Sequence, residues 1–339
     1  MTVRRHRRHV YLPVGLVLAL VLVAGTAAVA IAMTLGPGAP LGVGFPRVDR
    51  AQADTGPGAK QAIVEPPPGD VIPAGHVPVL MYHYIRLNPN PRDVVGRNLS
   101  VSPDHFTQQM QFAHDHGFKT ITLEQLYAAV AAGKKLDRRT MVLTFDDGYE
   151  DFYTTAWPVL KQNGFTATSY VVGDFVGKPG YMTWDQVDEL DRAGIEIGAH
   201  SLTHPDLTRQ TPAALDAQVA GSKAILEQHL GHPVYEFCYP AGRFNPAVLA
   251  NVHRAGYHDA TTTVPGVFES MPTAYYWPRV RIESIDTLPS FSQKLASGFA
   301  DYQKYGDKPA PGLFPSPLPS IAPSVDPSAS PTDYSRGTE

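Results

Sequence analysis

Thr144-Phe145-Asp146-Asp147-Gly148 closes a continuous apolar run that starts at Met141. A short apolar run that ends at a glycine is typical of a strand buried on both faces, as in a parallel sheet. Successive side chains of a strand point to opposite faces, but the glycine ends the strand directly after the acidic pair. Both carboxylates can therefore turn toward one rim. An Asp-Asp-Gly sequence can also simply form a turn, but the buried strand before it favours a functional site.

Strand-like and helix-like segments alternate through the middle of the chain. This alternation predicts a parallel α/β sheet with helices outside it. About seven such units within about 200 residues favour a closed or nearly closed (β/α) barrel, in which chemistry collects at the carboxyl ends of the strands. Strands are predicted at 77–85, 119–122, 140–145, 166–172, 195–199, 235–239 and 258–263, and helices at 103–116, 123–133, 150–163, 184–193, 212–230 and 246–255.

His200-Ser201-Leu202-Thr203-His204 follows the predicted strand 195–199. On a helix this spacing would place both imidazoles on one face, as in zinc proteases. Here the preceding segment is strand-like and Pro205 follows at once, so the pair belongs to a loop. Two imidazoles and one carboxylate leave a coordination position open for water, as catalytic zinc requires. Together with the acidic pair, the histidines predict a metal-assisted hydrolase.

The two motifs, in this order, resemble the first two motifs of the polysaccharide deacetylase family (NodB-like, carbohydrate esterase family 4). Phe237-Cys238-Tyr239-Pro240-Ala241-Gly242 is similar to the third motif, and the resemblance covers roughly residues 77–285. Val79-Leu80-Met81-Tyr82-His83 is most similar to exported poly-N-acetylglucosamine deacetylases. The family implies a distorted (β/α) barrel that binds a divalent metal ion, most commonly zinc.

The resemblance also implies roles for individual residues. Carried over by position, Asp147, His200 and His204 bind the metal and Asp146 is the general base. In the third-motif loop, Ala241 is the position whose main-chain N–H stabilises the oxyanion, and Tyr239 lies beside it on the substrate side.

Two features depart from the family pattern. No histidine follows His258 to act as the late proton donor, so His83 at the end of the first strand is the candidate acid, with a structural role as the alternative. The third motif usually carries an arginine that orients the base, and Cys238 stands at that position. Arg279 is predicted to replace it, with Arg281 as the other candidate.

The ends of the chain differ from its middle. Residues 1–9 contain four arginines, and the 26 residues from Val10 to Leu35 carry no charge. A run of this length fits a membrane-spanning helix better than the shorter core of a cleaved signal peptide, and the arginines favour a cytoplasmic N-terminus. A long cleaved signal peptide is the alternative, and both export the rest of the chain. We expect a basic end at 1–9, a transmembrane signal-anchor at 10–35, a flexible Gly/Pro/Ala linker at 36–75, a catalytic domain at 76–305 and a Pro/Ser-rich disordered tail at 306–339.

The net charge of −4 comes without a basic cluster outside the N-terminus, which argues against nucleic-acid binding. A single cysteine, Cys238, excludes an intrachain disulfide. We expect a membrane-anchored, extracytoplasmic metal-dependent hydrolase that removes N-acetyl groups from an amino-sugar polysaccharide, either an exopolysaccharide or peptidoglycan. The alternatives are a metal-dependent esterase or amidase for another acyl substrate and a catalytically silent glycan-binding module.

Overall fold

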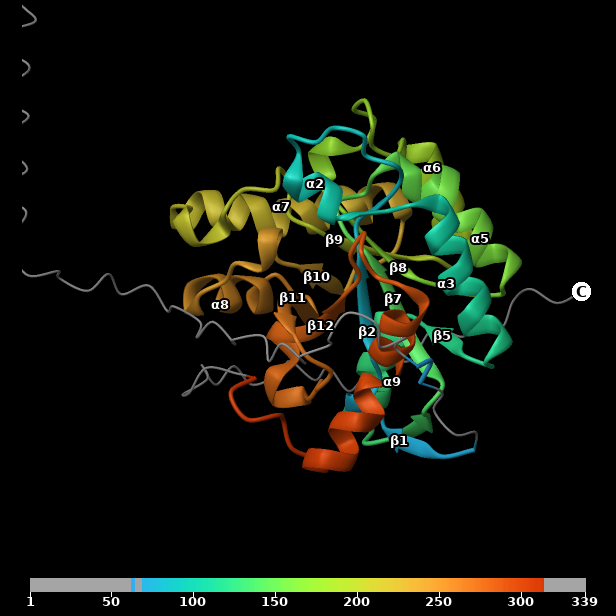
Figure 1. Ribbon diagram of the computed structural model, residues 1–339. Coiled ribbons are helices and arrows are strands. Elements are labelled where there is room, and N and C mark those ends of the chain that lie inside the picture. The colour runs from blue at the N-terminus through green and yellow to red at the C-terminus, as the bar shows by residue number, and fades with distance from the viewer. Residues whose placement is uncertain (1–61, 65–68, 314–339) are drawn as a thin grey trace, which may run out of the picture. The chain divides into compact units, whose positions relative to one another are not determined.

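The computed structural model describes residues 62–64 and 69–313 (Figure 1). The predicted signal-anchor and most of the predicted linker and tail lie outside these residues. Within the described ranges, no helix combines the length and the apolar character that crossing a membrane requires. The predicted span at 10–35 therefore stays a prediction.

Seven parallel strands form a closed barrel, as the alternation of strands and helices predicted. Pairing of β2 with β7 closes the ring, and β5 (Lys119–Ile121) pairs with the first half of β7 as an eighth strand. Around the barrel the order is β2 (Val79–Tyr82), β12 (Trp277–Arg281), β11 (Asp259–Pro265), β10 (Glu236–Cys238), β9 (Glu196–Ala199), β8 (Thr168–Val171) and β7 (Thr140–Phe145).

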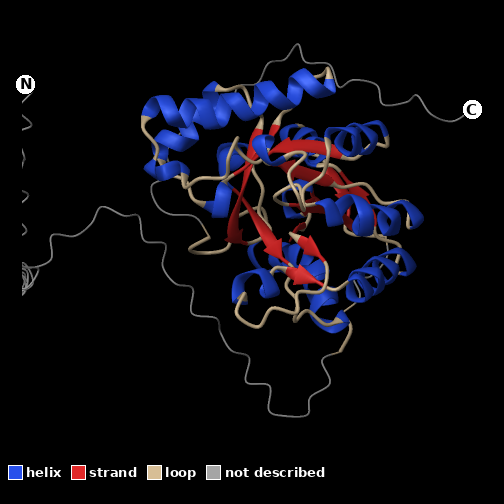
Figure 2. Ribbon diagram, turned by 90° about the horizontal axis from the view of Figure 1, so that it is seen from above, coloured by secondary structure: helices blue, strands red, loops and turns tan. Residues whose placement is uncertain are grey.

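Helices surround the strands (Figure 2). Their starts follow the predicted capping signals: Ser102 and Thr211 each accept a hydrogen bond from a first-turn N–H, and Thr122 with Gln125 forms a capping box. The α-helices are α2 (Val94–Asn98), α3 (Pro103–Asp115), α4 (Leu123–Ala131), α5 (Trp157–Gln162), α6 (Trp184–Arg192), α7 (Pro212–Leu230), α8 (Pro246–Arg254) and α9 (Leu288–Tyr305). Short 3₁₀ turns are η2 (Ala74–His76), η4 (Gly173–Phe175), η5 (Leu207–Arg209), η6 (Pro240–Gly242) and η7 (Met271–Tyr276).

Some elements differ from the sequence-based expectation. The run 77–85 is not one strand: it breaks at His83 into β2 and β3 (Tyr84–Ile85), and β3 pairs with β4 (Ser100–Val101). The predicted helix 150–163 contains a π-helical turn, η3 (Phe152–Ala156), before α5. The antiparallel pair of β1 (Val71–Pro73) with β6 (Lys135–Asp137) and the helix α9 were not predicted.

The amino ends of three neighbouring strands hold acids that are buried or half-buried. Glu196, Glu236 and Asp259 are the first residues of β9, β10 and β11, and Glu124 of α4 lies beside them. We call these four residues the amino-end carboxyl cluster. Glu196 accepts hydrogen bonds from two main-chain N–H groups at the start of α4. The cluster lies at the opposite end of the strands from the acidic pair and the histidines.

Candidate metal centre and active site

The predicted site residues gather at the carboxyl ends of the barrel strands. Asp146 and Asp147 directly follow β7, His200 directly follows β9, and His83 directly follows β2. Arg279 of β12 reaches the same rim, where its side chain donates a hydrogen bond to Asp146. The rim position that the sequence predicted for these side chains is confirmed.

Asp147, His200 and His204 form the predicted ligand set. Oδ1 of Asp147 lies 3.3 Å from Nε2 of His200 and 3.3 Å from Nε2 of His204. One ligand atom from each residue falls within 4.8 Å of the others. The main-chain carbonyl of Cys238 lies 2.7 Å from Nδ1 of His200. Because a carbonyl only accepts, this nitrogen donates and the second nitrogen faces Asp147, as is usual for a metal-binding histidine. Two imidazoles and a carboxylate fit a divalent ion such as zinc.

The charges of these three side chains suit such an ion. Burial raises the pKa of Asp147, but contact with His200 lowers it by more than burial raises it. The pKa of Asp147 therefore lies below its usual range, and the carboxylate is ionised. Burial and the neighbouring His200 lower the pKa of His204, which is therefore neutral at pH 7. Burial opposes charge on His200, yet Cys238 and Asp147 raise its pKa well above the usual value. Metal binding would displace a proton from His200.

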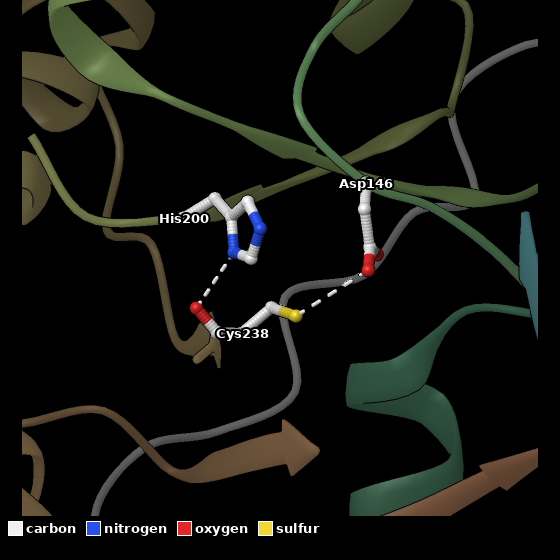
Figure 3. Close-up of side chains that lie close together, drawn as sticks. All are labelled: Asp146, His200 and Cys238. Carbon is white, nitrogen blue, oxygen red and sulfur yellow. Dashed lines mark hydrogen bonds between the residues drawn. The ribbon is translucent and has the colours of Figure 1, made fainter. Parts of the chain in front are cut away.

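A second set of possible ligands shares one histidine with the first. Asp146, His200 and Cys238 also bring donor atoms within 4.8 Å of one another (Figure 3). This second set already surrounds a cation, because Nη1 and Nη2 of Arg279 lie 2.7 and 2.8 Å from the two oxygens of Asp146. A divalent ion beside a buried guanidinium would be repelled. The first set is therefore the better metal site, and Asp146 remains free of it.

Asp146 has the surroundings of an ionised base. Its side chain is 2 % exposed, and the predicted contact with Arg279 is present. Burial raises the pKa of Asp146, but the Arg279 guanidinium lowers it more, so its pKa lies far below the usual range. His83 places Nε2 3.6 Å from Oδ2 of Asp146. Burial lowers the pKa of His83 despite both nearby aspartates, so its imidazole is neutral at pH 7.

In the third-motif loop the predicted substrate residue Tyr239 is buried, whereas Ala241 is exposed. Tyr239 is fully buried, and its hydroxyl donates to the carbonyl of Tyr275 at 2.8 Å. Ala241 is exposed and adopts a left-handed conformation with φ 53°. All four non-glycine residues with positive φ in the described part of the chain lie in the three motif loops: Asp147, Ser201, His204 and Ala241. Such conformations are costly and concentrate at functional sites.

The structure adds contacts that the sequence did not predict. Thr144 accepts a hydrogen bond from Arg279 at 2.9 Å and donates to the carbonyl of Leu80 at 2.8 Å. Beside Asp147, the rings of Tyr84 and Tyr149 stack with centroids 3.7 Å apart. Tyr149 directly follows the Asp-Asp-Gly motif, so its place next to the site was the one available signal.

Known proteins are similar to this chain in sequence and in fold. The family model of polysaccharide deacetylase matches residues 133–260. YxkH of Bacillus subtilis (strain 168), a polysaccharide deacetylase by name, is 32% identical over 206 residues, which cover 61% of this chain and 71% of YxkH. The poly-beta-1,6-N-acetyl-D-glucosamine N-deacetylase of Escherichia coli (strain K12) is 30% identical over 242 residues, 59% of this chain and 36% of that protein.

A solved structure agrees with these matches. The Streptococcus pyogenes deacetylase PplD in complex with acetate superposes with a TM-score of 0.61 at 30% identity, covering 65% of this chain and 97% of PplD. The barrel is thus shared over nearly all of that enzyme. As the motifs predicted, the chain belongs to the polysaccharide deacetylase family, the NodB-like hydrolases of carbohydrate esterase family 4.

Proposed function

We propose that this protein is a metal-dependent deacetylase that hydrolyses N-acetyl groups of an amino-sugar polysaccharide outside the membrane. The observation that carries the proposal is the pairing of the Asp147–His200–His204 ligand set with a separate, buried and ionised carboxylate, Asp146. A binding module would need neither. The relative named for poly-beta-1,6-N-acetyl-D-glucosamine supports a polymer of N-acetylglucosamine, an exopolysaccharide or the glycan of peptidoglycan, as the substrate.

Asp147, His200 and His204 would hold the ion, and zinc is the proposed ion because these are its usual catalytic ligands. When bound, a divalent ion polarises the acetyl carbonyl and lowers the pKa of an adjacent water. Asp146 accepts the proton of the attacking water, since Arg279 keeps this carboxylate ionised. Ala241, an exposed residue of the third-motif loop, is the proposed donor of a main-chain N–H to the developing oxyanion.

Departure of the sugar amine requires a proton. We assign its delivery to His83, which is neutral in the resting site and lies 3.6 Å from the base. The proton that Asp146 takes from water can pass to Nε2 of His83 and then to the leaving nitrogen. The proton count balances, because water supplies the proton that the amine gains.

The test is acetate release by the full-length protein from N-acetylglucosamine oligomers and from peptidoglycan, with added zinc. Asp146→Asn keeps the shape of the base without its charge, and Asp104→Asn, at an exposed site in the first turn of α3, is the matched control. Release that disappears with a chelator and in Asp146→Asn, but persists in the control, supports the proposal. Release from an acetyl ester alone would favour the esterase. A folded protein that binds no metal would favour the glycan-binding module.

The proposed location rests on the N-terminal sequence. The uncharged run 10–35 behind four arginines would anchor the chain, with the barrel outside the cell membrane and reaching its polymer through the linker. Protease treatment of intact cells should digest the barrel domain of the anchored form. Protection of the domain in intact cells, with digestion only after lysis, would contradict an exported enzyme.

A further inference from the structure

Cys238 contacts both halves of the proposed active site. Its thiol accepts a hydrogen bond from Nη2 of Arg279 at 3.1 Å and donates one to Oδ2 of Asp146 at 3.8 Å. Its carbonyl accepts from Nδ1 of His200 (Figure 3). The side chain is fully buried at the end of β10. One residue therefore touches the base, the arginine that holds the base, and a proposed metal ligand.

The guanidinium of Arg279 shows why the thiol matters. A guanidinium has five N–H donors in a rigid plane, and this one is fully buried, so each donor needs an acceptor. The five donors meet five acceptors: Nε bonds to the carbonyl of Thr262, Nη1 to Thr144 Oγ1 and Asp146 Oδ1, and Nη2 to Asp146 Oδ2 and Cys238 Sγ. Sulfur is the fifth acceptor.

We propose that Cys238 is a positioning residue for the general base. Its thiol completes the acceptors around Arg279 and thereby fixes the rotation of the guanidinium plane, which in turn fixes both oxygens of Asp146. Without the sulfur, one N–H of Nη2 loses its acceptor, which favours a guanidinium turned away from the carboxylate. The catalytic consequence rests on the proposed function, whereas the contact itself does not.

Two roles for a buried cysteine predict opposite orders of variants. If Cys238 only fills space, Cys238→Val and Cys238→Ala keep kcat, and Cys238→Ser is the worst because it buries a hydroxyl. If the sulfur acts as an acceptor, Ser retains the function because its oxygen also accepts from Arg279, whereas Val and Ala do not. A serine rescue is therefore the signature of the proposed role.

The kinetic experiment compares the three variants in the full-length, zinc-loaded protein with an N-acetylglucosamine oligomer as substrate. We expect Val and Ala to lower kcat about tenfold or more with KM nearly unchanged, and Ser to lose only a fewfold, because the lost hydrogen bond acts on the base and not on substrate binding. Zinc content should stay unchanged in all three. Val at full kcat with Ser below it would overturn the proposal.

A second measurement does not depend on activity. The melting temperatures of Cys238→Val, Cys238→Ser, Arg279→Met and the two double variants form mutant cycles. We expect the gap between Ser and Val to be larger with Arg279 than in the Arg279→Met background, because the N–H that the serine oxygen would accept is then absent and only the hydrogen bond to Asp146 remains. An equal gap in both backgrounds would refute the contact. If the wild-type protein releases no acetate, the proposed function fails while these cycles still decide whether Cys238 supports Arg279.

Discussion

Arg279 donates two parallel hydrogen bonds to Asp146, from Nη1 to Oδ1 at 2.7 Å and from Nη2 to Oδ2 at 2.8 Å, although the two residues are 133 positions apart in the sequence. Both side chains are almost completely buried. A planar guanidinium matches the plane of a carboxylate, so these two hydrogen bonds fix the orientation of Asp146 and also keep it charged. An ammonium group could supply the charge but not the orientation.

Replacing Arg279 should therefore separate the effect of its positive charge from its effect on the orientation of the Asp146 carboxylate. We expect Arg279→Lys to lower kcat about 100-fold, because a point charge holds the Asp146 carboxylate without fixing its plane. Arg279→Ala should also lower the free energy of unfolding by about 3–5 kcal/mol, since it leaves a buried carboxylate unpaired. Steady-state kinetics and urea unfolding measure the two effects. Arg281→Lys, on the same strand, is the matched control. An equal loss of kcat in both variants would contradict a specific role for the two hydrogen bonds from Arg279 to Asp146.

The ligand set predicts which changes remove the metal. We expect Asp147→Asn, His200→Ala and His204→Ala each to weaken zinc binding more than about 100-fold, because each removes a direct ligand. Activity should fall with the metal. Inductively coupled plasma analysis of dialysed protein and calorimetric titration measure the loss.

A histidine elsewhere provides the comparison for these variants. His229 stacks on Trp184 with ring centroids 3.7 Å apart and belongs to neither possible ligand set, so His229→Ala should keep its zinc. Loss of zinc from Cys238→Ala together with full retention in His204→Ala would indicate that the second ligand set holds the ion instead.

His83 should affect turnover without affecting the metal. We expect His83→Gln to lower kcat about 10²- to 10⁴-fold, the usual contribution of a general acid or base, with zinc content and melting temperature nearly unchanged. The physical reason is that glutamine can occupy the place beside Asp146 but cannot relay a proton. A fall in melting temperature with kcat preserved would instead show that His83 is structural.

Much of this architecture was readable from the sequence because local signals determined it. Capping residues such as Thr122 and Thr211 sit at the helix starts that they predicted, and β7 occupies the predicted residues 140–145. Buried parallel strands are continuous apolar runs, so their positions show in one dimension. The rim position of Asp146 and His200 followed directly from the ends of those strands.

Other features depend on contacts that no local pattern records. The five acceptors of Arg279 belong to four residues on three strands or their ends, and nothing near residue 279 in the sequence points to Thr144 or Cys238. The break of the first strand at His83 also escaped prediction, because the apolar run continues through it. The left-handed conformation of Ala241 has no signal in a residue type that usually avoids it.

The amino-end carboxyl cluster predicts an unusual dependence of stability on pH. Burial raises the pKa of Glu196 from 4.5 to about 7, and burial with the neighbouring acids Glu196, Glu124 and Asp259 raises the pKa of Glu236 well above its usual value. The folded protein thus holds protons that the unfolded chain has released. Stability should fall as the pH rises from about 4.5 to 7 and beyond, by up to about 1.4 kcal/mol per pH unit for each such group.

Glu236→Gln tests this dependence, because an amide keeps a donor toward Glu124 and never ionises. We expect the variant to melt at a higher temperature than the wild type at pH 8 and to lose this advantage at pH 5. Glu189→Gln, at an exposed position of α6, should change neither value. Parallel melting curves for Glu236→Gln and the wild type across this pH range would show that the cluster does not hold extra protons.

Ala241 predicts that backbone conformation, rather than side-chain chemistry, matters in the third-motif loop. Its φ of 53° is accessible to glycine at no cost but strongly disfavours a β-branched residue. We expect Ala241→Gly to keep kcat and to change the free energy of unfolding by less than about 1 kcal/mol. Ala241→Val should lower kcat about 10²-fold, because the peptide must rotate and its N–H then leaves the position proposed for the oxyanion.

The exposed Ala247 in the first turn of α8 gives the matched substitution, since Ala247→Val adds the same side chain to a helical residue. Kinetics and melting curves for the three variants separate the effects. Full activity in Ala241→Val would show that catalysis does not require the left-handed conformation at this position. Equal losses in Ala241→Gly and Ala241→Val would instead assign the role to the methyl group, as a packing contact with the substrate.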